Sequence, residues 1–216
     1  MLYMTSQNVV DMFEMITQEM VQNKELLIRL DAQNGDGDLG LSMAGGFSKV
    51  SEGLMSTDEK DLGRLFLKIS KTLNEAAPST LGTLLSIVFM GMAKSLKGSE
   101  RMDAGMFVGG LEAGVLSLME KGGAKPGEKT IVDALYPAIE TMKTALQSDP
   151  SFVEVLEKGR TAAHEGMEKT KEMRSVHGRA AYYREKSIGI QDGGATVGML
   201  LMKGCADYCQ QAAEDA

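Results

Sequence analysis

Apolar side chains recur every three to four positions over most of this chain, which is the period of an amphipathic helix. The first such stretch follows a capping Thr5 or Ser6 and runs to Leu30, so it places Asp31 at the end of a helix. Because no run alternates convincingly with the period of a strand, the pattern predicts an all-α protein of about eight helices. The length of 216 residues and the 43% hydrophobic content suit a single domain over 1–216.

Residues that favour helix ends divide the rest of the chain. A second helix is expected through Phe47 and Val50, then a polar connection over 51–60, and a third helix that begins after Thr57 or Asp58. Five later helices are predicted. One starts at Ser79 or Thr80, beyond Pro78, and the next follows a capping Asp103 and ends at Gly122-Gly123. The last three span 130–146, Asp149-Pro150 to about Met173, and 196 to about 213.

The connections between these helices hold most of the residues that are candidates for binding a ligand or taking part in a reaction. They are the segments 31–42, 75–82, 122–131 and 178–194. Short connections make neighbouring helices antiparallel and place alternate connections at one end of a bundle. Within the helix after Asp103, Gly109, Gly110 and Gly114 permit close approach of another helix.

The segment 30–47 crowds three carboxylates, Asp31, Asp36 and Asp38, among five glycines. Like charges at this spacing repel each other unless a cation or strong hydrogen-bond donors lie among them. Carboxylate oxygens suit magnesium, which fills its remaining positions with water and substrate phosphate oxygens. The glycines let backbone N–H groups approach an anion beside the metal. The segment therefore predicts a metal-nucleotide site.

Three other structures could explain this segment of Asp, Asn and Gly residues. A turn with Asx caps remains open, because Asn, Asp and Gly are common in turns. A calcium-binding EF-hand fails, since its glycine position holds Leu39 and its closing glutamate position holds Gly45. A Walker-type phosphate loop would need a Gly-Lys-Ser/Thr ending that the segment lacks.

Two further places suit a phosphate. Ser79 or Thr80 would present a hydroxyl and free N–H groups at a helix N-terminus, although an ordinary helix cap explains the same residues. Arg179, in the irregular region 174–194, could hold phosphate by two parallel hydrogen bonds or form a structural salt bridge.

Charge and composition exclude several classes of function. A net charge of −7 and an isoelectric point near 5.0 argue against nucleic-acid binding. The N-terminus shows no secretory signal and no apolar run is long enough to span a membrane, so the cytoplasm is expected. Cys205 and Cys209 are interpreted as reduced core residues, and His164 as structural; His177 could touch a ligand.

Three separated motifs resemble the nucleotide-binding L subunit of the dihydroxyacetone kinase family. The first is Asp-x4-Asp-x-Asp at Asp31, followed by Gly40 and Gly45-Gly46-Phe47. The second is Pro126-Gly127-Glu128-Lys129-Thr130-Ile131, similar to the Pro-Gly-Asp-Lys-Thr-Met segment of that family. The third comprises Gly178-Arg179-Ala180-Ala181-Tyr182, Ser187-Ile188-Gly189 and Gln191-Asp192-Gly193-Gly194-Ala195-Thr196.

The resemblance implies an eight-helix antiparallel barrel with a nucleotide at one rim. Asp31, Asp36 and Asp38 would hold one or two Mg2+ ions on the phosphates of ADP or ATP. The nucleotide would be lined by Leu39, Gly40, Leu41 and Ser42, with Ser79 and Thr80 on its phosphates, Gly122 and Ile131 beside adenine, and Arg179, Asp192, Gly193 and Gly194 over phosphate and sugar. No nucleophile stands out. Dihydroxyacetone would be bound by a separate K-type subunit, and a phosphotransferase-system M-type protein could recharge the ADP.

The sequence departs from the family pattern at three places. Leu39 stands where histidine is usual, Gly193 replaces a usual proline, and Ala76-Ala77-Pro78 replaces glycines. These changes leave open which ketose or polyol is the substrate and whether ATP or a protein is the phosphoryl donor. A subunit for another ketose or polyol and a non-catalytic, nucleotide-binding regulator are the alternatives.

Overall fold

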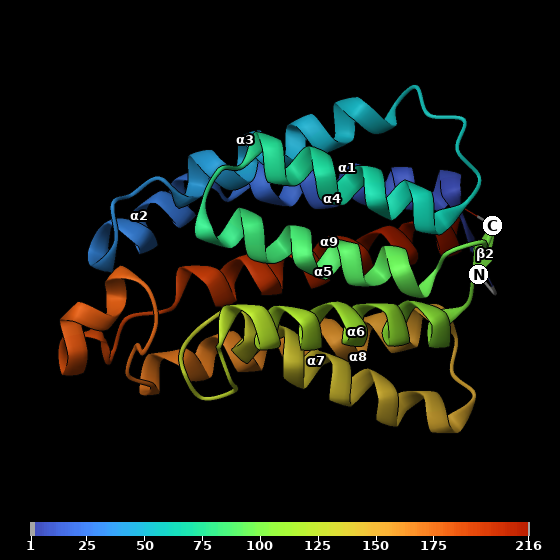
Figure 1. Cartoon of the computed structure of the whole chain (residues 1–216). Coiled ribbons are helices and arrows are strands. Elements are labelled where there is room, and N and C mark those ends of the chain that lie inside the picture. The colour runs from blue at the N-terminus through green and yellow to red at the C-terminus, as the bar shows by residue number, and fades with distance from the viewer. Residues whose placement is uncertain (1–2, 216) are drawn as a thin grey trace.

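The computed structural model describes residues 3–215, which form nine α-helices, three 3-10 helices and one short pair of strands (Figure 1). The α-helices are α1 (Ser6–Gln22), α2 (Lys24–Asn34), α3 (Leu39–Leu54), α4 (Leu62–Ala76), α5 (Thr80–Ser95), α6 (Ala104–Gly122), α7 (Val132–Ala145), α8 (Phe152–Lys169) and α9 (Gly193–Glu214). The 3-10 helices are η1 (Leu146–Ser148), η2 (Thr170–Glu172) and η3 (Arg179–Ser187), and antiparallel β1 (Met4–Thr5) and β2 (Arg101–Met102) pair near the N-terminus. The predicted all-α class is confirmed.

Eight of the helices close into a ring. In the order α1, α3, α4, α5, α6, α7, α8 and α9, each helix packs on the next, and α9 packs on α1. Neighbours in this ring run in opposite directions, so α3, α5, α7 and α9 all begin at the end away from the chain termini (Figure 1). The ninth helix, α2, packs on α3, α9 and η3.

The first predicted helix is broken in two, which accounts for nine helices where about eight were expected. The break is at Asn23, whose backbone N–H donates to the Glu19 carbonyl at 3.1 Å and whose side-chain Nδ2 donates to the same oxygen at 2.9 Å. Asparagine side chains compete in this way with the regular helix ladder. As a result Asp31 lies in the last turn of α2 rather than after a single long helix.

The helix ends test the predicted caps. Ser79 and Asp103 are confirmed as N-caps: Ser79 Oγ accepts from the Gly82 N–H at 3.1 Å, and Asp103 Oδ1 accepts from the Met106 N–H at 2.8 Å. Two other starts were wrong. Asp61 caps α4 in place of Thr57 or Asp58, because its Oδ1 accepts from the Arg64 N–H at 3.0 Å.

The start of α8 was also predicted too early. Ser151, not Asp149-Pro150, caps this helix, because Ser151 and Glu154 form a reciprocal capping box. Asp149 instead takes a left-handed backbone conformation with φ of 50°. Helix α3 continues to Leu54, which lies within the predicted connection over 51–60.

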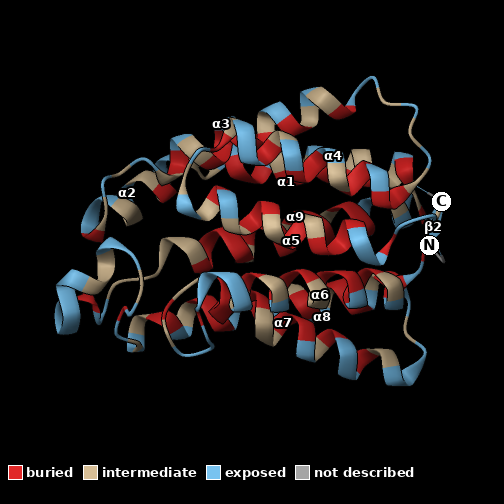
Figure 2. Cartoon of the chain, in the orientation of Figure 1, coloured by how far each residue is buried: buried red, intermediate tan, exposed pale blue. Residues whose placement is uncertain are grey.

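The core lies inside the ring, where the helices turn their buried faces toward one another (Figure 2). Four phenylalanines, Phe13, Phe47, Phe66 and Phe89, meet there at ring-centroid separations of 5.3–6.5 Å. Many of the methionines fill the same interior, as expected for flexible apolar side chains. Among the described residues no helix is both long and apolar enough to cross a membrane.

Helices α5 and α6 approach each other through glycine. A Cβ atom added to Gly114 would lie 2.3 Å from the Val88 carbonyl oxygen, and one added to Gly91 would lie 2.4 Å from the Gly114 Cα. Gly109 and Gly110 were also expected to permit close approach. Gly109 has nothing within 4 Å of such an atom, and the nearest atom to Gly110 is 3.7 Å away. Only Gly114 of the three is required by the packing.

We expect Gly114→Ala to destabilise the protein by about 1–3 kcal/mol, because the methyl group forces two backbones apart. Gly109→Ala is the matched control on the same helix and should be neutral or stabilising by up to about 1 kcal/mol, since alanine is the better helix former. Urea denaturation of both variants measures the free energies of unfolding. Equal changes in the two variants would contradict the packing described for α5 and α6.

Candidate functional site

A pocket of about 610 Å³ opens at the end of the ring where α3, α5, α7 and α9 begin. The N-cap residues of all four helices line it: Asp38, Ser79, Ile131 and Asp192. The first N–H groups of a helix have no partner within the helix, and the helix dipole is positive at this end. Four helix starts facing one cavity therefore make it suitable for an anion.

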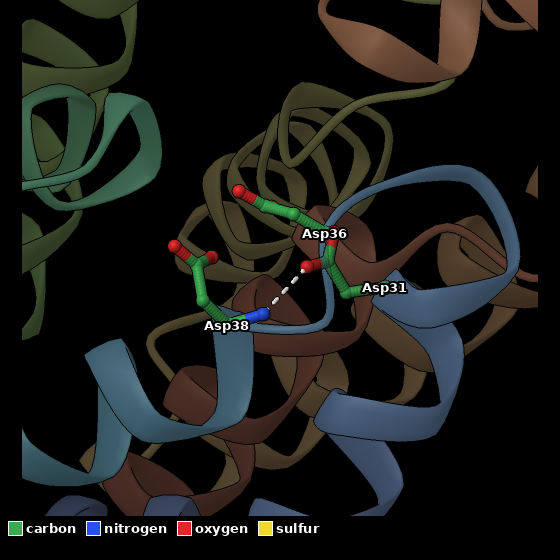
Figure 3. A group of neighbouring side chains, drawn as sticks. All are labelled: Asp31, Asp36 and Asp38. Atoms are coloured by element: carbon green, nitrogen blue, oxygen red, sulfur yellow. Dashed lines mark hydrogen bonds between the residues drawn. The ribbon is translucent and has the colours of Figure 1, made fainter.

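The three predicted acidic ligands lie together on one wall of this pocket (Figure 3). Asp31 is in the last turn of α2, Asp36 is in the connection, and Asp38 is the N-cap of α3. Their oxygen atoms lie within 4.8 Å of one another. No other group of three or more potential ligands from His, Cys, Asp and Glu occurs in residues 3–215.

The backbone between α2 and α3 folds around one carboxylate. Asp31 Oδ2 accepts from the N–H groups of Gly37 at 2.8 Å and Asp38 at 3.0 Å, and Figure 3 shows the second of these bonds. Gly37 has φ of 76°, a conformation that favours glycine. The simple turn interpretation therefore accounts for Asp31. It does not account for Asp36 and Asp38, whose carboxylates cap no N–H group in the described part of the chain.

The charge of this cluster is only partly compensated. Burial, followed by the negative charges of Asp36 and Asp31, raises the pKa of Asp38 above its usual value. Arg179, which comes from η3 on the other side of the pocket, forms an ion pair with Asp36. Three carboxylates beside one guanidinium carry an excess of negative charge, which a further cation would neutralise.

The surrounding polar atoms fit a hard cation. Asn34 Oδ1 is buried, lines the same pocket, and has no hydrogen-bond partner among the described residues. An amide oxygen beside three carboxylates is a donor set that suits Mg2+ or Ca2+. Ser175 Oγ, which lines the pocket from the segment before η3, is likewise buried and without a partner there. Sequence reasoning did not single out either residue.

The phosphate-binding residues predicted at the start of α5 line the pocket as well. Besides capping the helix, Ser79 Oγ accepts a hydrogen bond from Ser42 Oγ at 3.0 Å, which links the starts of α5 and α3. Thr80 is the first helical residue and also lines the pocket. Ser79 and Thr80 therefore share the pocket with the acidic cluster, and their contact with phosphate stays a prediction.

Asp192, Gly193 and Gly194 form the start of α9 and line the pocket. Asp192 Oδ2 accepts from the Ala195 N–H at 2.7 Å, yet burial raises the pKa of Asp192 to about 6. Added side-chain atoms at the two glycines would be crowded. A Cβ atom at Gly193 would lie 2.6 Å from Leu39 Cδ2, and one at Gly194 would lie 3.3 Å from the Ile131 nitrogen.

Four of the predicted nucleotide residues do not line the pocket: Gly40, Leu41, Ser42 and Gly122. Gly40 serves helix packing, because a Cβ atom there would lie 2.1 Å from the Lys24 carbonyl oxygen of α2. Leu41 points outward and is 56% exposed. Ser42 reaches the pocket only through Ser79, while Gly122 stands against Leu84, which does line it.

The segment between α8 and α9 covers the pocket from a further side. His177, Gly178 and Arg179 line the pocket, and His177 Nε2 lies 2.6 Å from Glu128 Oε2 in the connection before α7. The hydrogen bond with His177 lowers the pKa of Glu128. Lys129 also lines the pocket and is buried; the sequence placed it in a motif without assigning it a role.

The two cysteines are core residues, and His164 lies outside this site. Cys205 and Cys209 are both buried in α9 and free. Burial raises the pKa of both thiols, that of Cys209 to about 12, which keeps them protonated and unreactive near neutral pH. His164 lies away from the acidic cluster, in a second cavity of about 490 Å³ between α1, α8 and α9.

Comparison with known proteins shows the family of this chain. The family described as the DAK2 domain matches residues 33–207. The chain belongs to the DAK2 domain family. It is 32% identical over 179 residues to the ADP-binding subunit DhaL of the PEP-dependent dihydroxyacetone kinase of Escherichia coli, a match that covers 83% of this chain and 85% of that subunit.

Larger kinases in the family contain a similar region. The chain is 29% identical to a D-erythrulose kinase of Mycolicibacterium smegmatis, covering 90% of this chain and 34% of that one. A solved structure of the dihydroxyacetone kinase from C. freundii in complex with AMP-PNP and Mg2+ matches with a TM-score of 0.74 and 25% identity, over 92% of this chain and 33% of that chain. This chain thus corresponds to about a third of those proteins.

The raised pKa of Asp192 predicts a pH dependence of stability. Because the folded-state pKa is about 6 and the ordinary value is 3.8, folding favours the protonated carboxyl group. Its contribution to stability is present below pH 4 and is lost as the pH rises through 6. We expect wild type to lose about 1–2 kcal/mol relative to Asp192→Asn between pH 4 and pH 7, measured by urea denaturation.

Asparagine keeps an oxygen that can cap α9, so this variant removes the ionisation with little change in shape. Asp103→Asn, at the exposed N-cap of α6, is the control for the same substitution at a helix start. If wild type and Asp192→Asn showed parallel stability curves over this pH range, the assigned burial of the carboxyl group would be wrong.

Proposed function

We propose that this chain binds ADP or ATP with magnesium and is the nucleotide-binding part of a kinase that phosphorylates dihydroxyacetone or a related ketose. One observation carries the proposal: a carboxylate cluster and the N-termini of four helices line a single pocket. The carboxylates suit a divalent cation and the helix starts suit an anion. A nucleotide bound with magnesium supplies the cation and the anionic phosphates together. The family membership and the names of the relatives support the same function.

In this proposal Asp31, Asp36 and Asp38 hold one or two Mg2+ ions, with Asn34 Oδ1 as a further oxygen donor. When bound, magnesium bridges phosphate oxygens and neutralises the charge that develops on them during phosphoryl transfer. Asp31 also keeps the connection in shape through its backbone hydrogen bonds, so the ligand geometry depends on Gly37 as well as on the carboxylates.

The protein's own cationic and N–H groups would then bind the phosphates. The free N–H groups at the starts of α3, α5 and α9, with the hydroxyl groups of Ser79 and Thr80, would donate hydrogen bonds to phosphate oxygens. Arg179 offers a planar guanidinium that matches a phosphate by two parallel hydrogen bonds. Its ion pair with Asp36 already puts it next to the proposed metal ligands.

The apolar part of the lining would receive the adenine ring. It consists of Leu30, Leu39, Pro78, Leu81, Leu84 and Ile131. Gly122 borders this wall through its close approach to Leu84, in keeping with its assignment beside adenine. A cavity of about 610 Å³ lies within the usual range of small-molecule pockets.

The acceptor ketose is proposed to come from a K-type partner. Phosphoryl transfer needs positioning and charge neutralisation more than covalent help from the protein, and this pocket supplies both for the donor. Relatives are described as ADP-binding subunits of kinases, one of them PEP-dependent and another PTS-dependent. We therefore propose a K-type partner subunit for this chain, and as donor either ATP or a protein of the phosphotransferase system.

Binding of Mg-ADP and Mg-ATP tests the site by isothermal calorimetry. Asp36→Asn and Asp38→Asn should weaken binding by about tenfold or more, because each removes a charged oxygen from the metal. Asp58→Asn, an exposed residue in the α3–α4 connection, makes the same change of charge at the other end of the ring and should leave the affinity unchanged. Affinities for the first two variants equal to wild type would remove the assignment of the metal site.

A phosphoryl-transfer assay tests the activity. Mixed with a purified K-type subunit, wild type should phosphorylate dihydroxyacetone or erythrulose from ATP or from phosphoenolpyruvate with the phosphotransferase proteins. Asp38→Asn, added under the same conditions, should lose the transfer together with Mg-ADP binding. Tight nucleotide binding without transfer to any ketose from either donor would favour a nucleotide-binding regulator over a kinase.

A further inference from the structure

Lys129 makes an unusual set of contacts at the edge of the pocket. Its side chain is buried, with 4% of the residue exposed, and Nζ donates to three backbone carbonyl oxygens. The distances are 3.2 Å to Met173, 2.5 Å to Ser187 and 2.6 Å to Ile190. These acceptors lie at the two ends of the segment that joins η2 to α9. One ammonium group therefore ties together both ends of the segment 173–190.

These contacts use every proton that the ammonium group has. A lysine ammonium carries three donors and no acceptor, and here each donor has a carbonyl oxygen. No N–H remains for a phosphate oxygen, although Lys129 lines the same pocket. Its position in the lining is therefore explained by the segment it holds and not by direct contact with a ligand.

The backbone around Lys129 is fixed as well. Lys129 has φ of 63°, which is uncommon for a residue with a side chain. The buried carboxylate of Asp133 stabilises this turn, because it accepts from the N–H groups of Gly127 at 2.5 Å and Thr130 at 2.7 Å. Lys129 is thus held on a rigid base at the start of α7.

The segment that Lys129 ties down carries Arg179, and much of it is exposed. Besides Lys129, its links to the rest of the chain include the Gly189 N–H to the Lys171 carbonyl at 2.7 Å, and the partly exposed contacts of His177 with Glu128 and of Arg179 with Asp36. Most residues of η3 are exposed, with Tyr182 at 88%. Because little apolar burial holds this segment in place, the Lys129 contacts are a large part of what keeps it against the pocket.

We propose that Lys129 is a positioning residue, which clasps the segment 173–190 over the pocket and so holds Arg179 beside the acidic cluster. This rests on the nucleotide site proposed above. Lysine suits the position because a single nitrogen with three protons can meet three converging oxygens. A planar guanidinium presents its donors in a fork and cannot do the same, so arginine should not replace it.

Limited trypsin digestion without nucleotide tests the clasp directly. Arg174, Arg179, Arg184 and Lys186 are cleavage sites within the segment. Lys129→Met should increase cleavage there by about tenfold or more, since three buried carbonyl groups lose their partner. Lys129→Arg should loosen the segment too, and it serves in the same way if the methionine variant does not fold. Lys125→Met, an exposed residue of the same connection, is the control and should be cleaved like wild type.

Mg-ADP affinity shows whether Lys129 acts through Arg179. Lys129→Met and Arg179→Ala should each weaken binding, and the double variant should bind no more weakly than Arg179→Ala alone. A double variant in which the two losses multiply would mean that Lys129 contacts the nucleotide itself and would overturn the proposal, as would wild-type trypsin sensitivity in both Lys129 variants. If wild type did not bind Mg-ADP, the proposed function would be wrong. The digestion would still show whether Lys129 holds the segment 173–190 in place.

Discussion

The antiparallel packing of neighbouring helices is the constraint on which the rest of this structure depends. Each helix of the ring runs against the next, and closing the ring with an even number of helices keeps that alternation unbroken. Every second helix must then start at the same end. For this reason four helix N-termini meet at the mouth of the pocket, which is the open end of the ring. The positive dipole ends of these helices are placed there by the topology alone.

Charges of both signs line that mouth. Asp31, Asp36 and Asp38 form an acidic cluster, and the helix starts and Arg179 supply positive potential in the same pocket. Opposite charges within a few ångströms stabilise each other, which explains how a folded chain can hold three carboxylates together. A ligand that carries both a divalent cation and phosphates matches both kinds of group, and this is the basis of the function proposed here.

Two residues at the starts of two pocket-lining helices lie close together. Leu39 begins α3 and Gly193 begins α9, and any Cβ atom at residue 193 would lie 2.6 Å from Leu39 Cδ2. Leu39 and Gly193 both line the pocket, so its lining is apolar beside the starts of these two helices.

The sequence by itself determined the features that depend on near neighbours: the helical period, the caps at Ser79 and Asp103, and the spacing of three carboxylates around glycines. It did not reveal the break at Asn23, because a side-chain bond to the preceding turn competes with a helix that the apolar pattern continues. Only the tertiary structure decided that Gly40 packs against α2, that Arg179 pairs with Asp36, and that Lys129 holds carbonyls 44 to 61 residues away. Those contacts join segments distant in the chain, and their geometry exists only after the ring has closed.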